Sequence, residues 1–106
     1  MGMVRKSFSE RVVELARSVP EGRVTTYGSL ARAAGAGPMA AQSVTSILSK
    51  AYRSGITDIP FHRIVYANGT IWINESHRKK RMKLYEKEGI LFDSRDRITN
   101  FEQVLL

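Results

Sequence analysis

The stretch "VPEGRVTTYGSLARAAG", residues 19–35, decides the fold, because it ends one helix, opens a second and supplies the turn behind it. Residues 20–22, Pro-Glu-Gly, break the preceding helix, and residues 23–26 are typical of a short extended segment. Thr26 can cap a helix that begins at Tyr27 and runs to about residue 34. Two glycines then predict a tight connection to whatever follows.

Helices are predicted on both sides of this stretch. Ser7 and Glu10 form a capping box, and apolar residues then recur at helical spacing, which predicts a helix from about Phe8 to Ser18. A further helix is predicted from Pro38 to about Tyr52, because proline suits a first turn. One stripe of that helix is apolar: Ala41, Val44, Ile47, Leu48 and Ala51. Its other face is small and uncharged up to Lys50, so it can either approach another surface closely or simply be solvated.

A hairpin, one more helix and a tail complete the chain. Residues 64–66 and 70–73 are β-rich and flank an Asn-Gly pair, which is a strong hairpin signal. Asn74 or Ser76 is expected to open a helix that stops at Gly89. Residues 90–106 are interpreted as short strand or coil with a final turn.

These elements define the fold class. They predict one mainly α domain with a small β-hairpin wing, a winged helix-turn-helix-like DNA-binding domain over residues 1–106. Its core is expected over about 8–92, followed by a C-terminal tail, 93–106. The helix from Pro38 would be the one that reads the partner.

Charge and composition narrow the function. The chain has 106 residues and a formal charge of +7, from 17 Lys and Arg against 10 Asp and Glu, which indicates a polyanionic partner such as nucleic acid. It contains no cysteine, which excludes disulfides, cysteine zinc sites and a thiolate nucleophile. Only His62 and His77 could supply imidazole, without suitable carboxylate spacing, so neither metal nor other cofactor is expected.

Targeting signals are also missing from the sequence. Its apolar runs are far shorter than the ~18 residues of a membrane helix, and no signal-peptide core lies near the start. We therefore expect no membrane partner. The expected location is the cytoplasm, or the nucleus in a eukaryote.

Four ordered motifs carry a family resemblance. They are "VPEGRVTTYGSLARAAG" (19–35), "IPFHRIV" (59–65), "NGTI" (68–71) and "YEKEGI" (85–90). Together they resemble the DNA-binding domain of the alkylguanine-DNA alkyltransferases, and more closely the alkyltransferase-like proteins, over residues 8–92. In the enzymes, the acceptor cysteine stands in Pro-Cys-His-Arg, whereas the alkyltransferase-like relatives carry a tryptophan or another non-nucleophile there.

The resemblance implies a protein that binds DNA but transfers no alkyl group. Phe61 occupies the acceptor position, and a phenyl ring has no lone pair with which to take an alkyl group. The implied protein is not an enzyme but a sensor that binds duplex DNA containing alkylated guanine, flips the lesion into a pocket and flags it for repair. Nucleotide excision repair proteins are the implied downstream partners, and a monomer is expected.

Residue roles are carried over position by position. In the family, the tyrosine of "TYG" rotates the phosphate of the flipped nucleotide, and Tyr27 matches that tyrosine. The alternative is that Tyr27 is a half-buried packing residue. The family fills the vacated stack with an arginine where "PMAAQSV" (38–44) has Gln42. Glutamine can hydrogen-bond the orphaned base but lacks the cation and the flat stacking surface. A longer connector before Pro60 makes Lys50 or Arg53 candidates for DNA contact.

The complete predicted sites are as follows. The predicted DNA-binding residues are Thr26, Tyr27, Gly28, Pro38, Ala41, Gln42, Ser43, Ser46 and Lys50. The predicted lesion pocket comprises Tyr27, Pro60, Phe61, His62, Arg63, Val65, Tyr66, Asn68, Gly69 and Trp72. Glu88 is expected to pair structurally with His62. Arg63 could instead be a surface residue, and Trp72 a core residue. The basic run 78–83 is expected to be a solvated helix face, with a contribution to the field that attracts phosphates as the alternative.

One alternative function stays open at this point. A winged-helix regulator could read sequence in the major groove with the same fold. Such a regulator has no need of "IPFHRIV" beside its wing, or of a reader helix with few base-reading side chains.

Overall fold

A computed structural model of the protein describes residues 7–37, 40–71 and 75–106. The backbone forms two compact units, one comprising Met1–Ser18 with Tyr27–Ile59 and the other Val19–Thr26 with Pro60–Leu106. Each unit is therefore assembled from segments that are distant in the sequence. The single domain expected from the sequence stays a prediction.

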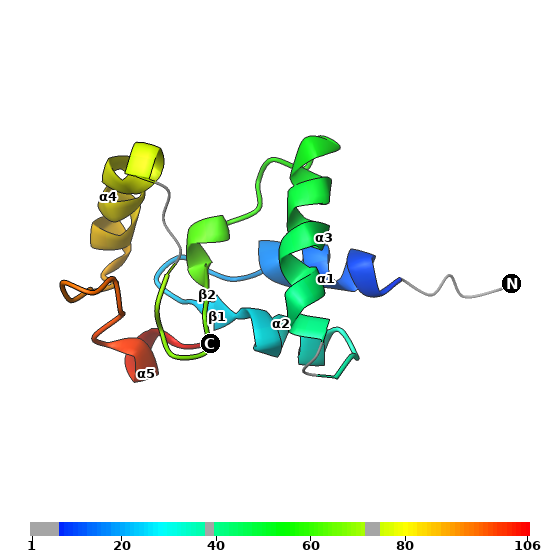
Figure 1. The fold of residues 1–106 in the computed structure, drawn as a ribbon, viewed down its shortest axis with the longest axis horizontal. Helices are drawn as coiled ribbons and strands as arrows, with labels where there is room; N and C mark the ends of the chain where they lie inside the picture. The colour runs from blue at the N-terminus through cyan, green and yellow to red at the C-terminus, as the bar shows by residue number, and fades with distance from the viewer. Residues whose placement is uncertain (1–6, 38–39, 72–74) are drawn as a thin grey trace, which may run out of the picture. The chain divides into compact units, whose positions relative to one another are not determined.

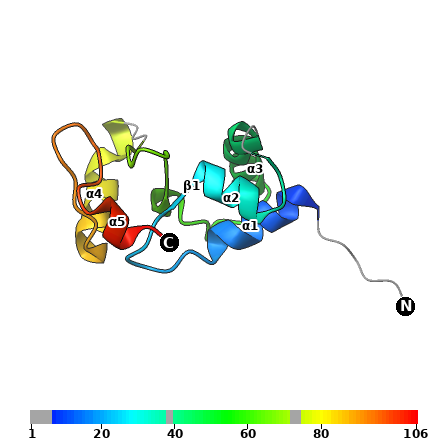
Figure 2. The ribbon, with the colours of Figure 1, turned by 90° about the horizontal axis from the view of Figure 1, so that it is seen from below.

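Among the described residues, the first unit contains the helices α1 (Phe8–Arg17), α2 (Tyr27–Ala33) and α3 (Ala41–Arg53) (Figures 1 and 2). The Ser7 Oγ accepts a hydrogen bond from the Glu10 amide at 3.1 Å, as the capping box predicts. This bond satisfies one of the orphan donors at the helix start. The predicted bounds of α1 and α2 are each confirmed to within one residue at either end.

The apolar stripes of these helices form the core of the first unit. Val12 and Ala16 of α1, Leu30 and Ala31 of α2, and Val44, Leu48 and Ala51 of α3 are all buried. Each large aliphatic side chain contributes about 1.5–3 kcal/mol by leaving water. The α3 helix begins at Ala41, after a single helical turn residue at position 40, and the predicted starting residue Pro38 lies outside the described residues.

The second unit holds the only sheet in the described part of the chain. Strand β1 (Thr25–Thr26) pairs in parallel with β2 (Ile64–Val65), with Thr25 opposite Ile64. A short 3₁₀ turn, η2 (Phe61–Arg63), leads into β2. The remaining elements are η3 (Glu75–His77), α4 (Arg78–Glu88) and α5 (Phe101–Val104). The core of the unit consists of Val24, Val65, Ile71, Tyr85, Ile90, Ile98 and Val104.

The predicted hairpin can be followed only in part, because residues 72–73 of its second strand lie outside the described residues. Its turn is present, since the Gly69 amide donates to the Tyr66 carbonyl at 2.9 Å and the Tyr66 amide to the Thr70 carbonyl at 3.0 Å. However, β2 pairs with β1, while Thr70 forms an antiparallel bridge with Arg97. Tertiary packing thus supplies strand partners that local turn chemistry cannot specify.

Two further helix predictions have definite outcomes. The helix expected to open at Asn74 or Ser76 begins at Arg78 after η3, and Asn74 lies outside the described residues. It ends, as predicted, at Gly89, whose φ of 75° is left-handed and suits glycine. The final turn predicted for the tail is α5, and the Leu106 amide donates to the Val24 carbonyl at 2.8 Å.

No helix in the described ranges has the length and apolar character that crossing a membrane requires.

Candidate nucleic-acid interface

The exposed face of α3 is small and polar, as the sequence indicates. Gln42, Ser43, Thr45, Ser46 and Ser49 are exposed, whereas Val44 and Leu48 on the opposite face are buried. Gln42, Ser46, Ser49 and Arg53 follow one another at helical spacing, and we term these four residues the α3 polar line. Arg53, which the sequence offers only as an alternative contact, therefore shares a line with Gln42.

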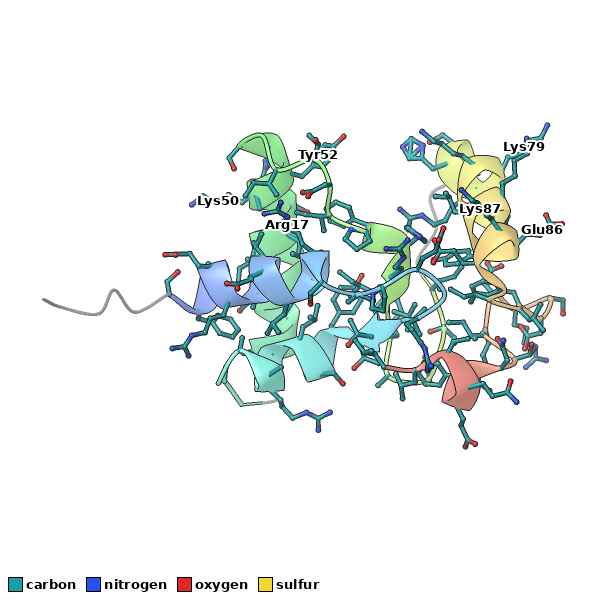
Figure 3. All side chains as sticks on the ribbon, turned by 180° about the vertical axis from the view of Figure 1, so that it is seen from behind. Arg17, Lys50, Tyr52, Lys79, Glu86 and Lys87 are labelled. Atoms are coloured by element: carbon teal, nitrogen blue, oxygen red, sulfur yellow. The ribbon has the colours of Figure 1, made fainter. Side chains whose placement is uncertain are left out.

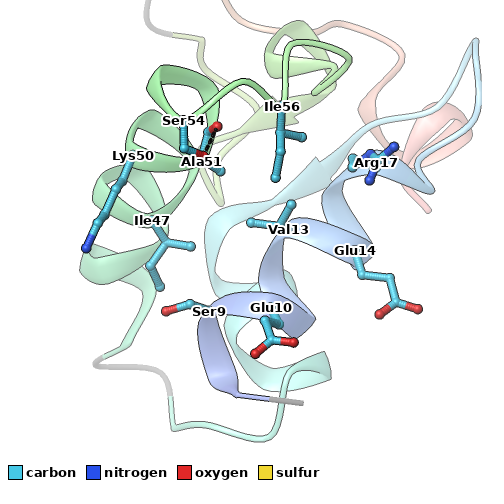
Figure 4. A pocket seen from close by; sticks show the side chains of 10 residues that line it. All are labelled: Ser9, Glu10, Val13, Glu14, Arg17, Ile47, Lys50, Ala51, Ser54 and Ile56. Atoms are coloured by element: carbon cyan, nitrogen blue, oxygen red, sulfur yellow. Dashed lines mark hydrogen bonds between the residues drawn. The ribbon is translucent and has the colours of Figure 1, made fainter.

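Lys50 lies on a different side of α3. It lines a groove of about 540 Å³ between α1 and α3 in the first unit, together with Glu10, Glu14 and Ile47 (Figure 4). Its side chain points away from the centre of the groove. Of Lys50 and Arg53, the two cations predicted near DNA, Arg53 is thus the one aligned with Gln42. The signal in the sequence that could have shown this alignment is the helical spacing of the two residues.

The start of α2 presents the "TYG" residues. Thr26 is buried as the last residue of β1, and Tyr27, half-buried, begins α2 directly after it. A Cβ added to Gly28 would meet nothing within 4 Å. Glycine inside a helix costs roughly 0.5–1 kcal/mol of stability relative to alanine, so Gly28 does not stabilise the fold.

The acceptor-like segment lies in the second unit. Pro60 is buried, and Phe61, His62 and Arg63 are half-buried in η2. The His62 ring lies edge-on to the buried Tyr85 ring, with centroids 5.8 Å apart. The side chains of this segment are consequently held by packing as well as by polar contacts.

Glu88 gathers the polar contacts of the segment. Its carboxylate accepts from His62 Nε2 at 2.6 Å, and from Arg63 Nε and a second Arg63 nitrogen at 2.9 and 3.0 Å. The Gly22 amide donates to it at 2.9 Å, and Arg63 also donates to the Val19 carbonyl at 3.0 Å. We term Gly22, His62, Arg63 and Glu88 the Glu88 cluster. The predicted His62–Glu88 pair is present, and Arg63 is bound within the cluster rather than extended into solvent.

The cluster determines the charge state of Glu88. Burial alone would raise the pKa of its carboxyl, but hydrogen bonds from Arg63, Gly22 and His62 outweigh burial and lower the pKa from 4.5 to about 2. The carboxylate is ionised at neutral pH and can only accept, so the His62 Nε2 must carry the proton that it donates.

This pKa predicts acid sensitivity. Because the folded state lowers the pKa of Glu88, the stabilisation is complete above its ordinary value of 4.5 and is lost as the pH falls toward about 2. The expected loss of unfolding free energy over this window is about 3 kcal/mol. Urea denaturation at a series of pH values measures it. Glu88→Gln, which cannot titrate, should show a shallower loss; equal slopes would contradict the assignment.

The other predicted pocket residues are placed as follows. Tyr66 and Asn68 are exposed, and the Asn68 amide oxygen accepts from the Thr70 amide and hydroxyl at 3.1 and 2.6 Å. Val65 lies in the core with 1% of its surface exposed. Gly69 is buried, and a Cβ there would meet the Phe101 ring at 3.2 Å. Trp72 lies outside the described residues. Val65 and Gly69 are therefore buried in the second unit, whereas Tyr66 and Asn68 are exposed.

The described residues contain no group of three or more His, Asp or Glu side chains placed to hold a metal ion.

Comparisons with known proteins agree on one family. Residues 7–90 match the family described as 6-O-methylguanine DNA methyltransferase, DNA binding domain. A DNA base-flipping protein of Escherichia coli K12 is 38% identical over 85 residues, which are 80% of this chain and 64% of that protein. One from Shigella flexneri matches to the same extent. The chain therefore spans less than two thirds of the length of these curated relatives.

Solved structures confirm the fold class. The crystal structure of S. pombe Atl1 in complex with damaged DNA containing O6-carboxymethylguanine matches with a TM-score of 0.73 at 25% identity, over 98% of both chains. A structure of S. pombe ATL in complex with DNA matches with a TM-score of 0.71 at 26% identity, again over 98% of both chains. A mainly helical helix-turn-helix fold with a small two-stranded sheet is thus confirmed.

Proposed function

This chain belongs to the family of the 6-O-methylguanine DNA methyltransferase DNA-binding domain, and from that premise we propose that it is a non-catalytic sensor of alkylated guanine in duplex DNA. It binds the duplex, turns the damaged base out of the stack and marks the lesion for repair. The names of its relatives support this role, since they include base-flipping proteins and an Atl1 complex with damaged DNA.

The observation that carries the proposal is the Glu88 cluster next to Phe61. His62 and Arg63 follow Phe61 directly and are both held by Glu88, so the polar surroundings of the acceptor position are ordered. The acceptor itself is a phenyl group, and no cysteine exists anywhere in the 106 residues to replace it. Such a site can pack an aromatic ring against a base, but it cannot form the bond to an alkyl group.

The first unit supplies the surface for duplex DNA. The α3 polar line can lie close to bases and sugars, because its residues before Arg53 are short or uncharged. Gly28 leaves open space at the start of α2, next to Tyr27, where a sugar or phosphate could approach the backbone. These features favour a groove-binding helix with Tyr27 beside it.

The test compares one duplex with and without a single O6-methylguanine, at fixed salt. We expect tighter binding of the alkylated duplex, because extruding a damaged base costs less than extruding a paired one and the pocket then holds it. Fluorescence anisotropy of labelled duplex measures both affinities. Equal affinities would refute the sensor and favour a regulator that reads sequence in the major groove.

Tyr27 provides a test of flipping itself. Tyr27→Ala should weaken binding of the alkylated duplex by about 5- to 30-fold, equivalent to ~1–2 kcal/mol, while binding of the intact duplex barely changes. Gln42→Arg should act oppositely, because a guanidinium can fill the vacated stack and adds a charge. Fluorescence of 2-aminopurine beside the lesion reports unstacking.

Tyr52→Ala is the matched control for that experiment, since Tyr52 is a half-exposed tyrosine of the same unit, at the far end of α3 (Figure 3). It should leave the ratio of the two affinities unchanged. If neither Tyr27→Ala nor Gln42→Arg alters the ratio or the fluorescence, flipping by these residues is refuted.

A sensor that does not repair the lesion itself needs a partner that does. We therefore keep nucleotide excision repair proteins as the proposed downstream partners and a monomer as the proposed state. Co-sedimentation of the protein on alkylated duplex, with and without such repair proteins, addresses both.

A further inference from the structure

Antiparallel pairing in the second unit centres on residues 91–99, which we term the tail hairpin. Phe92 bridges Ile98, and the Thr99 amide donates to the Leu91 carbonyl at 2.8 Å. On the other side, the Ile98 amide donates to the Gly69 carbonyl at 2.9 Å. The tail hairpin thus lies beside the Asn-Gly turn, where the sequence places the tip of a wing.

The loop of the tail hairpin is ordered by its own carboxylates. One Asp93 carboxylate oxygen accepts from the amides of Arg95 and Arg97 at 2.8 and 3.1 Å. Asp96, at a φ of 58°, is held from α4 by two hydrogen bonds from Arg78, at 2.9 and 2.6 Å. The negative charge of Asp96 is therefore neutralised locally, and the loop is held at both its start and its tip.

The ordered loop presents two arginines to solvent. Arg95 and Arg97 are exposed, and within the described part of the chain their guanidinium groups have no hydrogen-bond or ion-pair partner. Both line a cavity of about 350 Å³ with Thr70, Asp93 and Ser94. Guanidinium groups and a serine hydroxyl are donors suited to an oxyanion.

The charge of this cavity indicates which oxyanion fits. Two arginines and the Asp93 carboxylate leave one net positive charge among its lining residues. A phosphodiester carries a single negative charge and matches this balance, whereas a free phosphate carries up to two at neutral pH and would meet the Asp93 carboxylate as well. The charge balance therefore favours a backbone phosphate.

We propose that the cavity between Arg95 and Arg97 binds one backbone phosphate of duplex DNA, so that the tail hairpin serves as the wing. The inference rests on the proposed function for its partner, DNA, but not for its damage preference. Phosphate contacts position a protein and carry no sequence information, so the site should act equally on intact and damaged duplex.

The experiment titrates intact and O6-methylguanine duplexes with the wild-type protein and with R95Q/R97Q. We expect the double variant to weaken binding of both duplexes by about tenfold, and to reduce the slope of log affinity against log salt by about 1. The matched control is K83Q/K87Q, which removes two exposed cations from α4. It should change either affinity by less than about threefold.

Three outcomes would overturn the inference. Equal losses in the two double variants would mean that only net charge matters. A loss confined to the damaged duplex would place the arginines at the lesion. Unchanged duplex binding, with sodium phosphate shifting the amide resonances of residues 94–97, would assign the cavity to free phosphate. If the wild-type protein does not prefer alkylated DNA, the proposed sensor fails while the intact-duplex comparison still decides the phosphate site.

Discussion

Glu88→Ala is expected to lower the free energy of unfolding by about 4 kcal/mol, because removing one partner of a buried ion pair leaves the other uncompensated. The Glu88 side chain is 2% exposed, and the Arg63 side chain that it binds is 19% exposed. The variant would leave Arg63 and the Gly22 amide without this acceptor. Urea denaturation at neutral pH, analysed by linear extrapolation, measures the change.

Glu86→Ala is the matched control, since Glu86 is an exposed glutamate of the same helix (Figure 3). It should change the free energy of unfolding by less than about 0.5 kcal/mol. Combining Glu88→Ala with Arg63→Ala should cost less than the sum of the two single variants, because the unpaired cation disappears with its partner. A loss below about 1 kcal/mol for Glu88→Ala would refute the structural role of the cluster.

Salt is expected to weaken DNA binding more strongly than any single substitution. With a net charge of +7, we expect about four to six phosphates to be neutralised, which gives a log–log slope of about −4 to −5. Raising salt from about 50 to about 200 mM should then lower affinity for intact duplex by about 250- to 1,000-fold.

Anisotropy titrations at several salt concentrations measure this slope. Exposed lysines of α4 contribute to the net charge of +7, and Figure 3 shows two of them, Lys79 and Lys87, projecting from the helix. Unfolding followed in the same buffers serves as the control, because it separates lost binding from lost structure. A flat response to salt would argue against DNA as the partner.

Local order could be predicted from the sequence, because it depends on residues three or four apart. The capping box at Ser7 and the apolar stripe starting at Phe8 predict α1, and Gly89 predicts the end of α4. The apolar stripe of α3 likewise predicts which of its faces is buried. The sequence alone also excludes a thiolate nucleophile, since the chain contains no cysteine.

Only the tertiary structure decided how distant segments meet. An Asn-Gly turn specifies a reversal of the chain but not a strand partner, so β2 pairs with β1, some forty residues earlier in the sequence, and Thr70 with Arg97. The sequence did not decide whether Arg63 lies on the surface or in the site, because the two cases differ only in whether a carboxylate binds its guanidinium group. Glu88 does so from α4, through packing of Tyr85 and the rest of the second core, which no local pattern encodes.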